Sequence, residues 1–341
     1  MSMWNRMWIA AVAASFLFGL GSIAKADQAP ETITIATWNL EWFFDAHLGD
    51  NESDLAKEQS APSQAEWDWK KGVVAKAIAQ FKPTILCLQE IENRKVLMEL
   101  SDELKKKYQL NYRVAFIEGF DRATEQDVGI LYQSGCVEFS RKEQTKEQFD
   151  SQQYYNLSKH LFARFEWQAE GKTESLTILN VHFRAKAEES ALRLRQSKLA
   201  KLWVQERMSA GENVLIVGDT NIEEPFAAQP ATGGEVAELT GSATTSAADD
   251  MVDFHGRIAE GQRRTHLILD RQFDRFFGSK SLIEDAPNRK DWVLEKVEVL
   301  SQYCIRGTGP DLDHWDTRYT KDREERDVSD HYPVMATLRL Q

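Results

Sequence analysis

Several predicted strands end on side chains capable of acid–base or metal chemistry. Val214 to Val217 form a short apolar run that closes on Gly218-Asp219-Thr220-Asn221, which indicates a buried strand delivering polar groups to a sheet edge. Asp219 and Asn221 lie two positions apart, so they point to the same side if strand geometry continues. Such a pair can hold a divalent cation, a phosphate or a substrate hydroxyl. The alternative is an Asx-turn that closes the strand.

Polar or ionisable residues also close other predicted strands. These residues are Asn39, Glu90, His182, and Asp330 with its neighbour His331. Taken singly, a strand-end acid is more typical of a solvated or capping group, and a lone histidine is more typical of a satisfied core residue. If the sheets bring these ends together, carboxylates, imidazoles and carboxamides share one site.

That set of side chains suits the hydrolysis of phosphate esters. Hard oxygen ligands such as Glu90 and Asp330 favour Mg²⁺, with Mn²⁺ or Ca²⁺ as alternatives, over soft metals. The cation would neutralise a phosphate oxygen and the charge on the leaving group. One imidazole with a pKa near 7 can deprotonate water, and a second, protonated imidazole can donate to the phosphoryl oxygens.

The overall composition is that of a globular protein with an acidic charge balance. The 341 residues are 42% hydrophobic and 28% charged, with a net charge of −12. Residues 1–26 carry two basic residues and no acidic ones, so the rest of the chain has 40 basic and 54 acidic residues, a net charge of −14. A strongly acidic protein has no general attraction for nucleic acid, so polyanion binding must be local or metal-assisted.

The N-terminus has the pattern of a secretory signal peptide. Arg6 precedes the apolar run Met7 to Ile23, and Ala24-Lys25-Ala26 follows. This pattern predicts a signal peptide over 1–26 and a monomeric domain over 27–341, located in the periplasm or outside the cell without stable membrane insertion. An uncleaved anchor is the alternative, because the run is marginally long enough to span a bilayer.

The remaining patterns predict an α+β fold with two packed, mainly antiparallel sheets flanked by helices. Predicted strands cover 32–40, 84–90, 112–116, 128–132, 160–166, 176–183, 214–217, 265–278, 292–300 and 334–340. Predicted helices cover 66–81, 94–107 and 190–208, and predicted polar loops or linkers cover 45–64, 140–151, 223–249 and 306–326. Three cysteines, Cys87, Cys136 and Cys304, are too few for a disulfide framework and leave room for one bridge.

Six short motifs in this order carry a family resemblance. They are Trp38-Asn39, Leu88-Gln89-Glu90, Asn180-Val181-His182-Phe183, Gly218-Asp219-Thr220-Asn221, Phe273-Asp274-Arg275-Phe276 and Ser329-Asp330-His331-Tyr332-Pro333. The chain resembles the endonuclease/exonuclease/phosphatase superfamily, which contains the pancreatic-type deoxyribonucleases. The resemblance implies a four-layer α/β/β/α sandwich with the site at one end of its two sheets.

The resemblance also implies ligand roles for these residues. Glu90 resembles the main metal ligand, and Asp330 resembles a second acidic ligand. Asn39, Asp219 and Asn221 resemble the residues that hold phosphate, metal and attacking water.

Two imidazole roles follow from the same resemblance. His331 with Asp274 resembles a general-base pair, with Asp270 as a rival carboxylate. His182 resembles the second catalytic histidine, and Asp127 is the candidate for its acidic partner.

One departure concerns the phosphate contact. Nucleases of this family commonly present an arginine near the strand start at Ser158-Lys159-His160, and here that slot holds Ser158 or Lys159. Lysine is a point charge without the bidentate fork of arginine. Four nearby basic residues either supply a basic rim or form a solvated helix face: Arg184, Lys186, Arg193 and Arg195.

Three functions are compatible with these features. The leading expectation is a secreted, metal-dependent phosphodiesterase that acts as an endonuclease on DNA or RNA. The alternative is a phosphoesterase of the same fold that acts on a sphingomyelin-like phospholipid or an inositol phosphate. For the lipid alternative, Trp42-Phe43-Phe44 is a candidate membrane-contacting loop, although its position after a strand favours the core. The third function is a catalytically silent binding module.

Overall fold

Two six-stranded sheets form the centre of the molecule. The computed structural model describes residues 27–229, 232–245, 250–285 and 290–341, so the predicted signal peptide lies outside the described residues. The first sheet has the strand order β11-β12-β1-β2-β4-β3 and the second β5-β6-β7-β8-β10-β9. Among the strand pairs of the described residues, β1–β2 and β7–β8 are parallel and the others antiparallel, which confirms the predicted mainly antiparallel arrangement.

The strands have the following bounds. In the first sheet they are β1 Thr32–Phe43, β2 Ile85–Ile91, β3 Arg113–Ala115, β4 Asp127–Tyr132, β11 Trp292–Val299 and β12 Val334–Leu340. In the second they are β5 Cys136–Ser140, β6 His160–Ala169, β7 Lys172–His182, β8 Asn213–Asp219, β9 Met251–Asp253 and β10 Asp274–Ser279.

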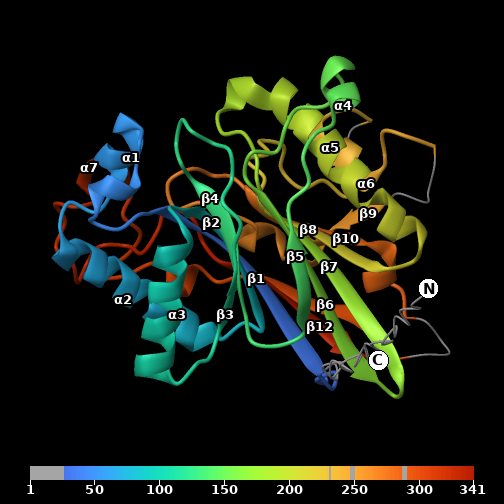
Figure 1. Ribbon diagram of the computed structural model, residues 1–341, viewed down its shortest axis with the longest axis horizontal. Helices are drawn as coiled ribbons and strands as arrows, with labels where there is room; N and C mark the ends of the chain where they lie inside the picture. Colours follow the sequence, from blue (N-terminus) through green and yellow to red (C-terminus); the bar gives the residue numbers. More distant parts are fainter. Residues whose placement is uncertain (1–26, 230–231, 246–249, 286–289) are drawn as a thin grey trace, which may run out of the picture.

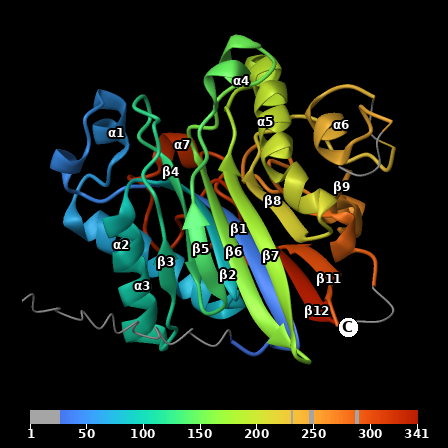
Figure 2. The same cartoon turned by 45° about the vertical axis from the view of Figure 1, so that its right-hand side comes forward.

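Helices cover the outer face of each sheet, as Figures 1 and 2 show. Helices α2 (Gln64–Phe81) and α3 (Arg94–Tyr108) lie against the first sheet, and α5 (Ser190–Ser209) and α6 (Glu235–Thr240) lie against the second. Three short helices, α1 (Asp54–Gln59), α4 (Lys146–Asp150) and α7 (His314–Thr317), lie in the connections. Short 3₁₀ turns cover Leu48–Asp50, Ala187–Glu189, Phe254–Arg257, Glu260–Gln262, Lys280–Leu282 and Ser301–Tyr303.

Three hydrophobic cores separate the four layers. Between the sheets, Trp167 and Trp292 pack edge to face with ring centroids 5.7 Å apart. Trp67 belongs to the core between the first sheet and its helices, and Leu199 to the core between the second sheet and its helices. The predicted α/β/β/α sandwich is therefore confirmed.

Local capping explains where the two helices on the first sheet begin and end. The side chain of Ser63 accepts from the amide of Glu66 at the start of α2, and Lys82 ends that helix in a left-handed conformation just before Pro83. Asn93 caps α3 by accepting from the amides of Lys95 and Val96.

Asn180 links the two sheets through buried hydrogen bonds. Its Nδ2 donates to the carbonyls of Leu88 and Gly129 at 3.1 and 3.0 Å, and its Oδ1 accepts from Gln89 Nε2 at 2.7 Å. In low-dielectric surroundings such bonds fix the relative position of the layers. In the motif Asn180-Val181-His182, Asn180 therefore has a structural role, whereas His182 is a candidate site residue.

The structure corrects several sequence predictions. The polar segments 45–64, 140–151, 223–249 and 306–326 contain α1, α4, α6 and α7 respectively, and β5 and β9 were not predicted. The predicted strand 265–278 begins only at Asp274, because the residues before Asp274 form hydrogen bonds with the segment 330–332. Leu267 donates its amide to the Asp330 carbonyl at 2.7 Å, and Tyr332 donates to the Thr265 carbonyl at 2.7 Å.

Two further observations concern cysteines and membranes. Cys87, Cys136 and Cys304 are all free, so the one bridge for which the sequence left room does not form. Among the described residues, every helix is too short or too polar to cross a bilayer.

Candidate active site

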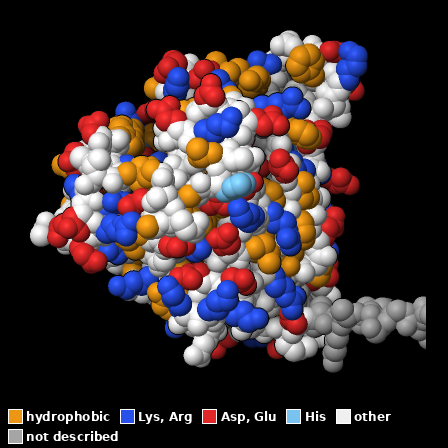
Figure 3. All heavy atoms as spheres, turned by 60° about the vertical axis from the view of Figure 1, so that its left-hand side comes forward, with side chains coloured by type: hydrophobic (Ala, Val, Ile, Leu, Met, Phe, Trp, Pro, Cys, Tyr) orange, Lys and Arg blue, Asp and Glu red, His pale blue; other side chains and the backbone are white. Residues whose placement is uncertain are grey.

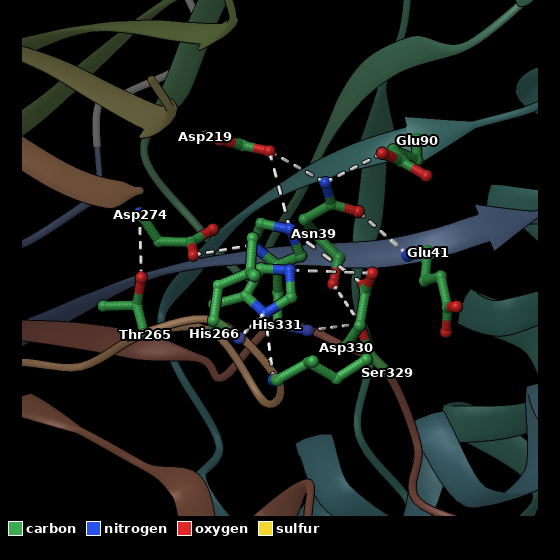
Figure 4. A network of polar contacts seen from close by, with 12 residues as sticks. Asn39, Glu41, Glu90, Asp219, Thr265, His266, Asp274, Ser329, Asp330 and His331 are labelled. Atoms are coloured by element: carbon green, nitrogen blue, oxygen red, sulfur yellow. Dashed lines mark hydrogen bonds and ion pairs between the residues drawn. The ribbon is translucent and has the colours of Figure 1, made fainter. Parts of the chain in front are cut away.

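The predicted strand ends do meet, and Asn39 lies at their centre. Its Nδ2 donates to Glu90 Oε1 at 3.0 Å and to Asp219 Oδ2 at 2.9 Å, which joins β1, β2 and β8 across the two sheets. Figure 4 shows this carboxamide between the two carboxylates, with His331 and Asp330 beside them. The sandwich thus gathers, at one end, residues that lie as far apart in the chain as Asn39 and Ser329, which are 290 positions apart.

Asp219 is positioned by the turn that follows β8. Gly218 has φ 142°, and a Cβ there would collide with the Val181 carbonyl, so this position requires glycine. Asn221 is left-handed, with φ 50°, and its amide donates to Asp219 Oδ1 at 3.0 Å. The strand geometry therefore stops at Asp219, and the Asx-turn alternative is the one observed.

Asn221 is held differently from the sequence expectation. Its Nδ2 donates to the Phe183 carbonyl at 3.2 Å rather than standing beside the Asp219 carboxylate on one strand face. Its backbone amide, not its side chain, makes the hydrogen bond with Asp219.

His331 and Asp274 form the predicted imidazole–carboxylate pair. His331 Nδ1 lies 2.8 Å from Asp274 Oδ2, and His331 Nε2 lies 3.8 Å from Asp219 Oδ2. Asp274 is fully buried on β10, in register with Asp219 on β8, whereas the rival carboxylate Asp270 is exposed. The structure therefore selects Asp274.

The backbone of His331 is fixed from both sides. Its amide donates to Ser329 Oγ at 3.1 Å, and its carbonyl accepts from Trp38 Nε1 at 2.9 Å. Ser329 Oγ in turn donates to the Asn39 carbonyl at 2.8 Å. The Ser-Asp-His motif and the Trp-Asn motif therefore hold each other in place.

The two site histidines have opposite protonation tendencies. Burial lowers the pKa of His331, but the negative charges of Asp274 and Asp219 outweigh it and raise that pKa well above 6.5. Burial, followed by the positive charge of Lys159, lowers the pKa of His182 to about 3. The pKa values of the two imidazoles are therefore shifted in opposite directions, that of His331 upwards and that of His182 downwards.

His182 faces the carboxylates but lacks the partner predicted for it. Its Nε2 lies 3.5 Å from Asp219 Oδ2 and 4.0 Å from Glu90 Oε1, while its buried Nδ1 has no hydrogen-bond partner among the described residues. Asp127 was the predicted partner, but its Oδ1 accepts from the Gly119 amide at 2.8 Å instead. Burial raises the pKa of Asp127 to about 7.

Lys159 lies close to the site without touching its carboxylates. Its Nζ lies 3.0 Å from Asp121 Oδ2 and donates to Gln126 Oε1 at 2.8 Å. Its charge nevertheless acts on both His182 and Glu90. The Lys159–Asp121 pair had no signal in the sequence, because it joins a strand start to a loop.

The predicted basic rim is only partly present. Arg184 and Lys186 are exposed, and Arg195 is half-buried, with its guanidinium donating to the Tyr154 carbonyl. Arg193 is fully buried and pairs with Glu235 at 3.2 Å. Arg193 therefore joins α5 to α6 and does not face solvent.

The carboxylates at the site fit a divalent cation. Glu90 Oε2 accepts from the Trp42 amide at 2.8 Å, and Asp330 Oδ2 accepts from Trp315 Nε1 at 2.8 Å. Neither has a lysine or arginine within ion-pair distance in the part of the chain that the structure describes. Burial, and then the charge of Asp330, raises the pKa of Glu90, which is the situation that a bound dication relieves.

In the part of the chain that the structure describes, three groups of side chains lie close enough to share an ion. Their ligand atoms are within 4.8 Å of one another, and the groups are His266-Asp330-His331, Asp219-Asp274-His331 and Asp45-Asp50-Glu92. Glu90 belongs to none of them, so the Glu90–Asp330 ligand pair stays a prediction.

His266 is a site residue that the sequence analysis missed. Its Nε2 lies 3.8 Å from Asp330 Oδ2, and its ring centroid lies 4.8 Å from that of His331. Its Nδ1 accepts from the amides of Ile268 and Leu269 at 3.1 Å each, which places the ring proton on Nε2. His266 stands in a segment that the sequence assigned to a strand, so its spacing gave no signal.

A buried ionic cluster also shapes the site from behind. Glu41 and Trp42 are both left-handed, with φ 49° and 47°, which turns the Glu41 amide to Asn39 Oδ1 at 2.9 Å. His314 Nε2 lies 2.6 Å from Glu41 Oε2, and Arg318 donates to the Glu41 carbonyl at 2.8 Å. The segment around α7 thereby holds the bend that aims Asn39 and Glu90.

Comparison with known proteins agrees with this geometry. The model of a family described as the endonuclease/exonuclease/phosphatase family matches residues 34–340, which is most of the chain. The chain belongs to this family. No curated protein matches the chain significantly.

Solved structures of this family share the fold at low identity. The human nocturnin catalytic domain with a bound sulfate has a TM-score of 0.55 and 12% identity, covering 92% of this chain and 96% of that one. An endonuclease/exonuclease/phosphatase from Bacteroides vulgatus has a TM-score of 0.54 and 15% identity, covering 91% and 99%. D. rerio TDP2 in complex with a single-stranded DNA product has a TM-score of 0.53 and 16% identity, covering 91% and 100%.

Proposed function

We propose that this protein is a secreted, divalent-metal-dependent phosphodiesterase that cleaves DNA or RNA internally. The observation that carries the proposal is the buried His331–Asp274 pair, 2.8 Å apart, whose imidazole faces Asp219. General-base attack on a phosphodiester needs this kind of oriented imidazole beside groups that hold water and phosphate. Family membership supports phosphoester chemistry.

Each side chain then has a definite task. Asp274 holds His331 with Nδ1 protonated, so Nε2 is the atom that takes the proton from the attacking water. Asp219 and Asn39 orient that water and the phosphate. His182, neutral and facing the carboxylates through Nε2, donates a hydrogen bond towards the phosphoryl group. Mg²⁺ held by Glu90 and Asp330 would supply neutralisation of the phosphate charge.

The charge distribution points to a local phosphate contact. Figure 3 shows acidic and basic side chains interspersed over the face turned forward, without a broad basic field. A cavity of about 490 Å³ lies beside the site, where its Asp121 pairs with Lys159. Seven of its lining residues are acidic: Asp50, Glu52, Glu92, Glu118, Asp121, Glu125 and Asp127. Without a bound cation, this acidic lining disfavours a polyanionic chain.

The nucleic-acid proposal has more support than its alternatives. D. rerio TDP2, which shares the fold, was solved with a single-stranded DNA product. Trp42-Phe43-Phe44 does not form an exposed membrane-contacting loop, because Phe43 and Phe44 are fully buried. A missing site residue would favour the catalytically silent binding module. No such gap is found among the residues that meet at the site, which include His331, Asp274, Asp219 and Asn39.

Export is part of the proposal and rests on the sequence of residues 1–26. We expect the exported protein to begin at Asp27 and to reside in the periplasm or outside the cell. Intact-mass measurement of the secreted protein tests this. A secreted protein that retains residues 1–26 contradicts it.

One incubation series tests the activity. The purified protein is mixed with plasmid DNA, RNA, sphingomyelin, an inositol phosphate and a chromogenic phosphodiester, each with Mg²⁺ or with EDTA. We expect Mg²⁺-dependent nicking of plasmid and loss of all hydrolysis in EDTA. Turnover of sphingomyelin or inositol phosphate without nucleic-acid cleavage would transfer the assignment to the alternative.

A further inference from the structure

Trp315 is a large aromatic side chain left in solvent at the edge of the site. It lies on α7, and 54% of it is exposed, although its indole N–H donates to Asp330 Oδ2 at 2.8 Å. The indole also packs edge to face on His266, with ring centroids 5.6 Å apart, and His266 lies 4.8 Å from His331. A single imidazole therefore separates the exposed indole from the His331 imidazole.

The segment that carries Trp315 is rigidly held on either side of it. His314 is buried, with its Nε2 2.6 Å from Glu41 Oε2, and Arg318 donates to the Glu41 and Trp42 carbonyls. The neighbours of Trp315 are thus anchored in the protein while its own ring stays outside. The position of the ring is fixed before any ligand arrives, which removes much of the entropic cost of binding.

Leaving this ring in solvent forgoes the stabilisation that burial of a large apolar side chain brings. An exposed, immobilised aromatic ring is what single-stranded nucleic-acid sites use to stack bases, because every base has a π-face. Trp315 reaches the site directly, because its N–H donates to Asp330 and its ring packs on His266.

We propose that Trp315 is a substrate-binding residue that stacks the base of the nucleotide next to the scissile phosphate. This inference rests on the nuclease function proposed above and adds the substrate class: single-stranded or locally unpaired nucleic acid, whose bases are free to leave the duplex stack. The hydrogen bond to Asp330 sets the orientation of the ring relative to the phosphate site.

The test compares two single-stranded oligonucleotides that differ in one base. The scissile bond is first mapped with the wild-type protein, and the nucleotide beside it is then replaced by an abasic residue. Base–aromatic stacking of about 1–3 kcal/mol corresponds to a change of roughly 5- to 150-fold. We therefore expect the abasic substrate to raise KM by that factor with wild type, with kcat changing far less.

Variants of Trp315 separate stacking from the hydrogen bond. Trp315→Ala should raise KM for the normal substrate by the same factor and abolish the difference between the two substrates. Trp315→Phe keeps a ring without the N–H and should retain most of the difference, whereas Trp315→Gln keeps a donor without the ring and should lose it. Phe149→Ala, which removes an exposed aromatic side chain from α4, is the matched control and should behave as wild type.

The outcomes distinguish this inference from the function on which it rests. If wild type cleaves nucleic acid but treats the two substrates alike, or if Trp315→Ala keeps the difference, base stacking by Trp315 is refuted and the nuclease function stands. If wild type cleaves none of the oligonucleotides or the plasmid, the proposed function fails and takes this inference with it.

Discussion

Nδ1 of His331 lies 2.8 Å from Oδ2 of Asp274, although 57 positions separate the two residues in the chain. Strand β10 places Asp274 opposite Asp219 on β8, and the segment 329–332 carries His331 to both of them. Because two buried carboxylates face one imidazole, its pKa is raised well above 6.5. This cluster connects the pH dependence of the activity to the fold.

Asp274→Asn should move the acid limb of the pH–rate profile to lower pH. A general base works unprotonated, so the raised pKa of His331 makes kcat/KM fall as the pH drops through that pKa. Removing the Asp274 charge lowers the pKa and shifts the limb down, while the lost orientation lowers kcat by on the order of 10²–10⁴. Profiles of kcat/KM from pH 5 to 10 check this, and an unmoved limb would contradict the base assignment.

His331→Ala and His182→Ala should each lower kcat by on the order of 10²–10⁴ with little loss of stability. Both imidazoles act on one transition state, so the double variant should lose less than the product of the two single losses. Turnover of plasmid or chromogenic phosphodiester, with melting temperature as the folding check, measures this. Near-wild-type turnover of either single variant would contradict the catalytic role assigned to that histidine.

Glu90→Gln should weaken Mg²⁺ binding more than it weakens folding. The substitution removes a negative charge from a half-buried carboxylate that has no lysine or arginine partner among the described residues. Titration calorimetry of Mg²⁺ and thermal melting measure the two effects, with the exposed Glu138→Gln as the control. Equal Mg²⁺ affinity in wild type and Glu90→Gln would remove Glu90 from the ligand set.

Asn180→Ala should destabilise the sandwich by about 3 kcal/mol, because buried groups that lose their hydrogen-bond partner cost about 1–3 kcal/mol each. The groups that lose Asn180 as a partner are the carbonyls of Leu88 and Gly129 and the side-chain Nε2 of Gln89, which keeps its hydrogen bond to Thr37 Oγ1. Denaturant unfolding measures the change, and the exposed Asn111→Ala should stay within about 0.5 kcal/mol of wild type. A loss that small for Asn180→Ala would refute the linking role.

Acidification from pH 6.5 towards 4 should destabilise the protein through His160. Burial lowers the pKa of His160 to about 3, and its Nε2 accepts from the Lys142 amide, which requires the neutral ring. In the unfolded chain His160 takes up a proton near pH 6.5. The contribution of the neutral His160 to the free energy of unfolding is therefore fully present above that pH, and it falls by up to about 1.4 kcal/mol per pH unit below it.

The variant His160→Gln isolates this contribution. It should show a shallower loss of the free energy of unfolding between pH 6.5 and 4, measured by denaturant titration at each pH. The pKa values of His182 and His266 are also lowered to about 3, so part of the slope should remain. An unchanged slope in His160→Gln would show that His160 does not set the acid sensitivity.

The sequence by itself determined the fold class and most site residues. Apolar alternation and short buried runs marked strands such as 32–40 and 334–340, because period-2 patterning follows directly from strand geometry. The motifs around Asn39, Asp219 and His331 identified the residues that converge, since strand ends carrying polar groups are readable locally. The choice between Asp270 and Asp274 was left open.

Only the tertiary structure decided which groups touch and in what charge state. The spacing of residues along the chain does not specify that Asp127 binds the Gly119 amide instead of His182, or that Arg193 is buried against Glu235. His266 joins the site from a segment that the sequence assigned to a strand, and Trp315 joins it from the short helix α7 within a predicted loop. Protonation depends on burial and on charges brought together by folding, so the opposite pKa shifts of His331 and His182 follow from the packed carboxylates and from burial, which the sequence does not specify.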